Sequence, residues 1–103
     1  MSEETLIGQA TEGQIATWKK KYGKVFGIKV GGHICYLKAA DRKAISYASV
    51  AGKSDPLKFN ETILNSCFIG GSAEIKTNDE LFLGAGKVLP ELIQLKEAEL
   101  VNF

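Results

Sequence analysis

The stretch from Gly23 to Arg42, GKVFGIKVGGHICYLKAADR, constrains the fold of this chain more than any other. It contains two runs rich in β-branched and aromatic residues, separated by the pair Gly31-Gly32. Because glycine adopts positive φ readily, a Gly-Gly pair suits the tight two-residue turns that join antiparallel strands. The pattern therefore predicts a β-hairpin with strands at about residues 24–30 and 33–39.

The same turn sets the register of the strands and sorts their side chains onto two faces. If Val30 lies opposite His33, then side chains alternate between the faces along each strand. One face carries Phe26, Ile28, Val30, His33, Cys35 and Leu37. The other face carries Val25, Gly27, Lys29, Ile34, Tyr36 and Lys38. The first face is nearly all apolar and is expected to be buried. Because a lone hairpin is marginal in water, helices must cover it.

Helix start signals lie on both sides of the hairpin. Thr11, Asp41 and Asp55 each precede a helical pattern and can accept hydrogen bonds from the N–H groups of its first turn. A capping box at Thr77 begins a last helix, which Pro90 should kink because proline removes a backbone hydrogen bond. The predicted helices cover residues 12–22, 42–51, 56–69 and 78–100.

Together these elements predict an α+β fold, with one antiparallel hairpin packed against about four helices. A chain of 103 residues has the length of one domain and can bury a core of its own. We expect residues 11–103 to form this domain. Residues 1–10 carry little pattern and are expected to be a flexible tail.

Charge and composition exclude several classes of partner. A net charge of +1 argues against duplex DNA or an anionic membrane surface. No apolar run approaches the roughly 20 residues that span a bilayer. The first residues lack the hydrophobic core of a signal peptide, so we expect a cytoplasmic protein. Cys35 and Cys67 both occupy apolar positions, which favours two buried thiols in a reducing compartment, with a disulfide as the alternative.

The residue types that carry catalysis are present but scattered. His33 is the single histidine, and no carboxylate stands near it in the sequence. We therefore expect a structural or exposed imidazole. Gly70 and Gly71 follow a predicted helix rather than a strand, so the context of a phosphate-binding loop is missing. The sequence predicts no catalytic residues, no metal site and no cofactor, and hence no enzyme.

Two binding functions stay open beside a protein-binding role. Tyr36 lies on the outer hairpin face near Lys29 and Lys38, and an aromatic ring among cations can stack on single-stranded nucleic acid. A small-ligand domain is the other alternative, and it requires a polar-lined pocket where the hairpin meets the helices. Protein binding is reached mainly by elimination of catalysis.

Several short motifs follow one another along the chain in a characteristic order. A Lys-rich helix end leads into a G-K-V strand, a small-residue helix follows the second strand, and a later helix ends in N-S-C-F-I-G-G. The corresponding pieces are Lys21–Val25, Tyr36–Arg42, Ser46–Gly52, Asn65–Gly71 and Asn78–Leu83. Over roughly residues 12–100 this order resembles small tail-assembly-chaperone-like proteins of tailed phages and prophages. The resemblance implies a small β element packed on helices, in the cytoplasm of a bacterial host. It also implies a role in keeping the long tape-measure protein soluble until the tail tube polymerises around it.

A chaperone of this kind has to cover an apolar helical client reversibly. That task requires an exposed apolar strip or an unpaired strand edge. The candidate protein-binding residues come from the outer hairpin face and from the C-terminal segment. They are Val25, Ile34, Tyr36, Leu95, Leu100, Val101 and Phe103. Ordinary core packing and self-association are the alternatives for both groups.

Overall fold

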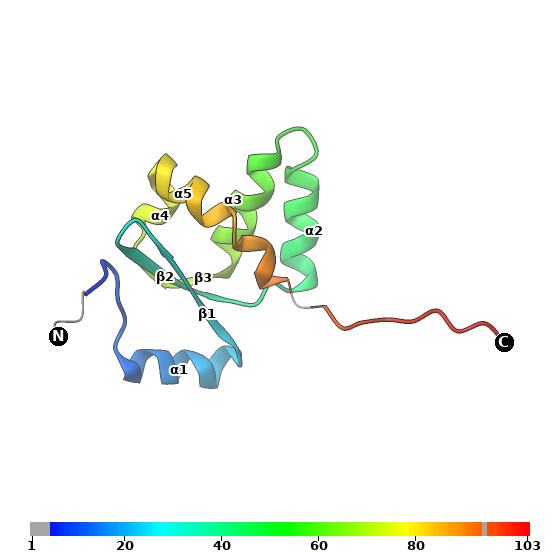
Figure 1. The fold of residues 1–103 in the computed structure, drawn as a ribbon, viewed down its shortest axis with the longest axis horizontal. Coiled ribbons are helices and arrows are strands. Elements are labelled where there is room, and N and C mark those ends of the chain that lie inside the picture. Colours follow the sequence, from blue (N-terminus) through cyan, green and yellow to red (C-terminus); the bar gives the residue numbers. More distant parts are fainter. Residues whose placement is uncertain (1–4, 94) are drawn as a thin grey trace.

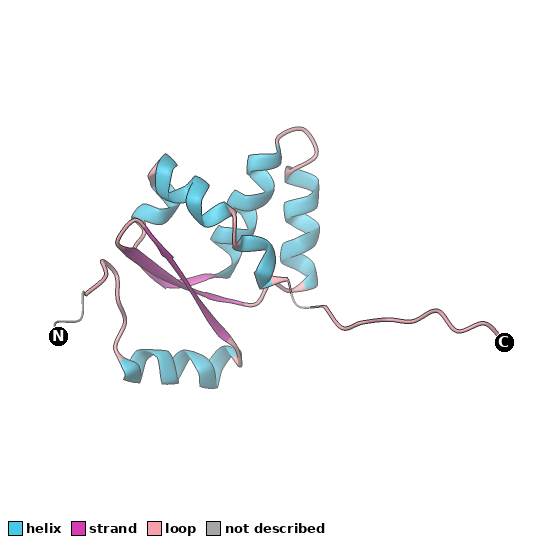
Figure 2. Cartoon of the chain, viewed as in Figure 1, coloured by secondary structure: helices cyan, strands magenta, loops and turns pink. Residues whose placement is uncertain are grey.

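Three antiparallel strands lie at the centre of the fold, in the spatial order β1, β2, β3 (Figures 1 and 2). The computed structural model describes residues 5–93 and 95–103. Figure 1 shows α1 on one side of the sheet and α2, α3, α4 and α5 on the other. The fold class is therefore α+β, as predicted. The strands are β1 (Val25–Val30), β2 (His33–Lys38) and β3 (Phe68–Gly71).

The hairpin has the predicted register. Val30 pairs with His33, and Phe26 pairs with Leu37 at the other end of the ladder. Gly31 and Gly32 have φ values of 55° and 80°, so both central turn residues occupy the positive-φ region that the primed hairpin turns require. The conformational freedom of these glycines thus determines the register of the whole ribbon.

The third strand was not predicted. The helix expected over 56–69 ends at Cys67 as α3 (Pro56–Cys67), and β3 then pairs antiparallel with β2. Glycine makes this close pairing possible: a Cβ on Gly71, whose φ is 105°, would lie 2.6 Å from the Cys35 Cα. Gly70 and Gly71 are therefore strand residues that pair with β2, and they do not end a helix.

The first two helices match their predicted bounds. They are α1 (Glu12–Tyr22), which begins at the Thr11 capping box, and α2 (Arg42–Ala51). The Asp41 carboxylate accepts a hydrogen bond from the backbone N–H of Ala44 at 2.8 Å and so begins α2. These caps are satisfied within a few residues of the chain, which is why the sequence predicts them well.

The last predicted helix is wrong over most of its length. In place of one bent helix over 78–100, the chain forms α5 (Asp79–Gly86), preceded by the short α4 (Glu74–Thr77). A 3-10 turn, η1 (Leu89–Leu92), follows, and the described residues beyond it are not helical. Glycine and proline near the end of α5 weaken the helix, and buried Leu92 is followed by few residues that could continue an apolar stripe.

The core lies between the sheet and α2 to α5. Ile28, Cys35 and Leu37 of the apolar hairpin face are buried here, as predicted, whereas Phe26 and Val30 pack against the core and are only partly buried. The buried residues of this core are each at most 6% exposed. Its fully or nearly fully buried members are Ile28, Cys35, Leu37, Ala48, Ile63, Leu64, Cys67, Ile75, Ala85, Leu89 and Leu92.

The N-terminal segment joins the sheet. The Ile7 N–H donates to the Gly32 carbonyl, and the Ile34 N–H donates to the Ile7 carbonyl, both at 2.9 Å. Ile7 thereby forms a parallel bridge with His33 beside β2. Of the tail expected to be flexible over residues 1–10, Ile7 and Ala10 are thus tied to the domain by hydrogen bonds. Residues 1–4 lie outside the described residues.

Candidate protein-binding surface

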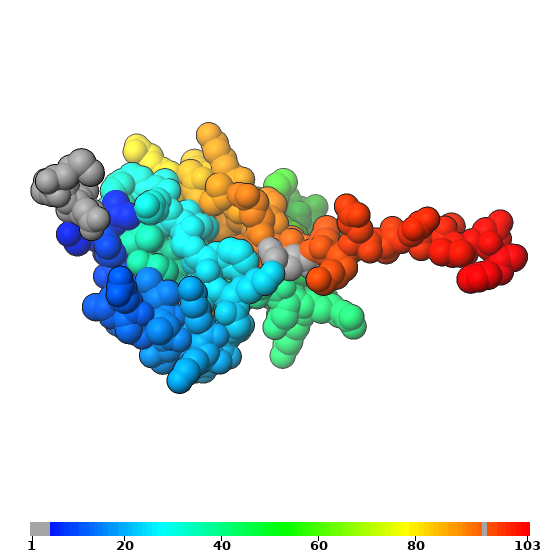
Figure 3. Space-filling model, turned by 60° about the horizontal axis from the view of Figure 1, so that its bottom comes forward, coloured from blue at the N-terminus to red at the C-terminus, as the bar shows by residue number. Residues whose placement is uncertain are grey.

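The C-terminal segment, residues 95–103, extends away from the body of the protein (Figures 1 and 3). It has no helix or strand in this structure, and the whole molecule measures 60 × 33 × 24 Å. The large apolar side chains on it are Leu95, Leu100, Val101 and Phe103, with exposed fractions of 85, 97, 59 and 112%. The exposure expected for these candidate binding residues is therefore present.

The point at which the segment leaves the body is well defined. Leu92 is 2% exposed, and its carbonyl accepts a hydrogen bond from the Ala40 N–H at 3.1 Å. Beyond it the sequence LKEAELVNF carries charges at Lys96, Glu97 and Glu99, which favour water over the core. The segment therefore begins at an anchored residue and presents its apolar side chains to solvent.

The outer edge of β1 has no strand partner among the described residues. Because Val30 and His33 flank a two-residue turn, they form a hydrogen-bonded pair, and bonding alternates from there. The backbone groups of Lys29 and Gly27 therefore point away from β2. The pairing of Ile34 agrees with this, since its N–H and C=O bond to Ile7 and Ser72 on the side away from β1.

A hollow of about 280 Å³ lies beside this edge. Its walls come from β1 and from the end of the α5–η1 region, and most of them are apolar. The residues that line it are Phe26, Gly27, Ile28, Val88, Glu91 and Leu92. The β1 edge thus combines unpaired backbone groups with a recess that an apolar side chain can enter.

The outer hairpin face is not the exposed surface that the sequence predicted. Ile34 and Tyr36 are 7% and 6% exposed, and Val25 is half-buried. The Trp18 ring of α1 lies 5.2 Å from the Tyr36 ring, centroid to centroid, and the Ala10 N–H donates to the Tyr36 hydroxyl oxygen at 3.1 Å. The sequence signal for this cover is the spacing of Ile15, Trp18 and Tyr22, which lie three and four residues apart and give α1 an apolar face that needs a surface to pack on.

Burial of Tyr36 also removes the stacking platform on which a nucleic-acid function depended. A ring covered by Trp18 cannot stack on a base. The nearby cation of Lys38 lies over the Tyr22 ring, 5.6 Å from its centroid, in a cation–π contact within the chain. Of the platform that the sequence suggested, only the lysines are left, without the Tyr36 ring.

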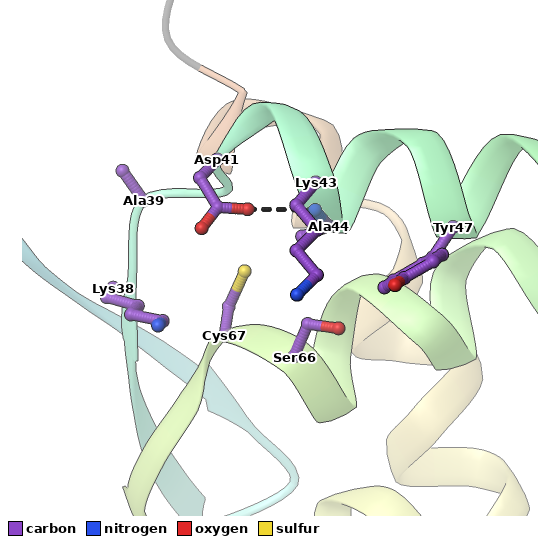
Figure 4. A pocket seen from close by; sticks show the side chains of 8 residues that line it. All are labelled: Lys38, Ala39, Asp41, Lys43, Ala44, Tyr47, Ser66 and Cys67. Atoms are coloured by element: carbon purple, nitrogen blue, oxygen red, sulfur yellow. Dashed lines mark hydrogen bonds between the residues drawn. The ribbon is translucent and has the colours of Figure 1, made fainter.

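A pocket of about 260 Å³ lies where the hairpin meets the helices (Figure 4). The Cys67 thiol points into the space between Asp41, Lys38 and Lys43. Burial raises the pKa of the Cys67 thiol, although the Lys38 charge opposes the shift. The thiol is therefore protonated at neutral pH and is a weak nucleophile. The full lining is Lys38, Ala39, Asp41, Lys43, Ala44, Tyr47, Ser66 and Cys67.

His33 has partners that the sequence did not reveal. Its Nδ1 lies 2.8 Å from the Ser72 Oγ, a residue 39 positions away, and its Nε2 lies 3.7 Å from the Glu74 carboxylate. A serine, a histidine and a carboxylate in this order resemble a nucleophilic relay. However, Ser72 is 6% exposed, and neither Ser72 nor His33 lines the junction pocket or the hollow beside β1. The contact ties the start of β2 to the turn after β3.

The cysteines are free and buried, as the composition favoured, and no disulfide joins them. Burial raises the pKa of the Cys35 thiol to about 11. Within residues 5–93 and 95–103, no group of His, Cys, Asp or Glu side chains could hold a metal ion. In the same residues no helix is both long and apolar enough to cross a bilayer.

Comparison with known proteins gives no match: no protein-family model, no curated protein and no solved structure matches the chain. The likeness to tail-assembly chaperones therefore stays a prediction from short motifs. What the chain does has to be inferred from its own surface, and above all from the segment 95–103.

Proposed function

We propose that this chain is a non-catalytic assembly factor that binds an apolar helical protein through its C-terminal segment. One observation carries the proposal: Leu95, Leu100, Val101 and Phe103 project from a single segment and are each more than half exposed. Apolar side chains gathered outside a core commonly mark a protein-binding site. Elsewhere in the described chain the most exposed large apolar side chain is Val50 at 68%, against 97% for Leu100 and 112% for Phe103.

The energetics suit reversible binding. Burying a leucine, valine or phenylalanine side chain contributes about 1.5–3 kcal/mol. Fixing the backbone of a bound segment costs about 1–2 kcal/mol per residue. The cost of ordering the segment therefore offsets most of the gain from burial, so a complex formed through it is expected to be weak and to dissociate readily. An assembly factor requires this behaviour, because it must release its client when the client is built into a larger structure.

The motif order supplies the class of client. It resembles tail-assembly chaperones, whose client is the long helical tape-measure protein, and this setting implies the cytoplasm of a bacterial host. A long helix with an apolar face offers the extended surface that several apolar side chains in a row can cover. The proposed client is therefore a long helical tail protein of the tape-measure kind.

Co-expression with that protein tests the proposal. The soluble fraction of the client is measured with the wild-type chain, without it, and with the double variant Leu100→Ser and Phe103→Ser. We expect the wild type to raise the soluble fraction and the double variant to lose this effect. The matched control Asn102→Ser changes the same segment without removing an apolar side chain and should behave as wild type. A client that is equally soluble without this chain contradicts the proposal.

Small-ligand binding at the junction pocket is a second candidate function. The observation that favours it is the gathering of Lys38, Lys43 and Ser66 around a recess of about 260 Å³ (Figure 4). Such groups can donate hydrogen bonds to an anion. Titration with inorganic phosphate, followed by backbone NMR, should then shift the resonances of residues 38–44. Resonances that do not move at high phosphate would remove this candidate.

A further inference from the structure

We propose that the C-terminal segment 95–103 of one copy adds as a strand to the open edge of β1 in a second copy. The contact is one between copies of this chain, so it holds or fails independently of the client proposed above. Strand addition uses main-chain hydrogen bonds for affinity and alternate side chains for specificity. Both halves of such a contact lie on this molecule.

The acceptor is the outer side of β1. Lys29 and Gly27 direct their backbone N–H and C=O groups away from β2, whereas the opposite side of the sheet is already occupied by β3 and Ile7. Gly27 is exposed and carries no side chain, so another backbone can approach it closely. An open edge of this kind is a template for pairing with another chain.

The donor is long enough and is already extended away from its own body. Each extended residue spans about 3.3 Å, so the segment 95–103 can run along the whole of β1, which has 6 residues. To pair with β1 of its own copy, the chain would have to reverse direction just after Leu92, which lines the hollow beside that strand. Figures 1 and 3 instead show the segment leading outward.

The side chains of the segment match the two faces of β1. In an extended strand Glu97, Glu99, Val101 and Phe103 share one face, and Lys96, Ala98, Leu100 and Asn102 share the other. Suppose that the segment runs antiparallel to β1 with the first set on the side of Lys29. Glu97 and Glu99 then lie near the Lys29 ammonium, and Phe103 lies near the half-buried Val25. Leu100 then faces the hollow of about 280 Å³ between β1 and η1. If the two faces of the segment were exchanged, Glu97 and Glu99 would lie against the apolar hollow.

The contact explains how an exposed apolar segment can be tolerated before a client arrives. Pairing would cover Leu100 and Phe103 and would close the β1 edge at the same time. Because each copy carries both the donor segment and the acceptor edge, the contact can close as a reciprocal two-fold dimer or continue head-to-tail into rings or open chains of copies. A client that binds the segment would compete with the second copy.

Multi-angle light scattering after size-exclusion chromatography tests the inference with the full chain. We expect the wild-type mass to rise with concentration, and the Leu100→Ser/Phe103→Ser variant to stay monomeric. An edge variant, Gly27→Pro, should also stay monomeric, because its N–H points away from β2 and its loss leaves the hairpin ladder intact. Mixing the two variants should produce a dimer, because each retains the surface that the other lacks.

Exchanging the charges of Lys29 and Glu99 provides a second test, and because both residues are exposed the exchange should leave the fold intact. Lys29→Glu and Glu99→Lys should each weaken association by about two- to fivefold, and the two changes placed on separate copies should restore it. A wild-type chain that is monomeric at every concentration would overturn the inference. So would a tail variant that associates as the wild type does, or protection of the Gly27 and Lys29 amides from hydrogen exchange in a monomer.

Discussion

The indole ring of Trp18 occupies the space in which a side chain on Gly70 would lie: a Cβ at Gly70 would be 2.6 Å from the Trp18 Cζ2 atom. This contact joins α1 to β3 across the outer face of the sheet. It connects a helix from the start of the chain with a strand from its second half. The glycine in β3 is thus required by packing and not by a turn.

Replacing this glycine should destabilise the domain. Gly70→Ala places a methyl group against the Trp18 ring, and overpacking of this kind costs about 1–3 kcal/mol. Urea denaturation followed by tryptophan fluorescence measures the change. Gly13→Ala is the matched control, because Gly13 lies in α1 with ample space around it, and alanine there should stabilise the helix by about 0.5–1 kcal/mol. Equal stability of wild type and Gly70→Ala would show that α1 does not pack as described.

The hydroxyl of Tyr36 should contribute to the docking of the N-terminal segment. Tyr36→Phe removes the acceptor of the Ala10 N–H and should lower the free energy of unfolding by about 0.5–1.5 kcal/mol. The same change should speed hydrogen exchange at the Ala10 amide. Tyr47→Phe serves as the control, because Tyr47 is 59% exposed and the Lys43 ammonium lies over its ring, a contact that phenylalanine retains. Unchanged exchange at Ala10 would contradict this assignment.

Ser72 should act as a structural partner of His33 and not as a nucleophile. Ser72→Ala leaves the buried Nδ1 of His33 without its partner, which should cost about 1–3 kcal/mol in stability. A fluorophosphonate probe, which labels activated serines, should leave the wild-type protein unmodified. Ser49→Ala, which removes an exposed hydroxyl bonded to the Ile45 carbonyl, should change stability much less. Labelling at Ser72 would revive a catalytic interpretation.

The Cys35 thiol should make stability fall at alkaline pH. Its pKa is raised from 9.0 to about 11 in the folded protein because burial disfavours the thiolate. The folded state therefore holds the proton more tightly, and this stabilisation is complete below pH 9 and is lost as the pH rises toward 11. The loss should amount to about 2 kcal/mol.

Urea denaturation at a series of pH values measures this effect, and Cys35→Ala is the comparison. The variant is less stable at neutral pH because it leaves a small cavity, but it should show a shallower loss between pH 9 and 11. Parallel pH profiles for the two proteins would mean that the thiolate forms without opening the core.

The sequence was sufficient wherever the controlling interaction spans a few residues. Gly31 and Gly32 determine the turn and therefore the register of β1 and β2. Thr11 and Asp41 satisfy N–H groups within the first turn of their own helices, so α1 and α2 were predicted with their correct bounds. The exposure of Leu100 and Phe103 was also expected, because a small core has no room for every apolar residue.

Contacts between distant segments could not be found in this way. Phe68–Gly71 is too short to show strand alternation, and it becomes a strand because β2 offers it an edge. His33 meets Ser72 for the same reason, and Tyr36 is buried because α1 folds back over the hairpin. Local hydrogen bonds and glycine geometry are thus determined by the sequence alone. Tertiary structure decided which faces are covered, because burial depends on where segments far apart in the chain come to pack.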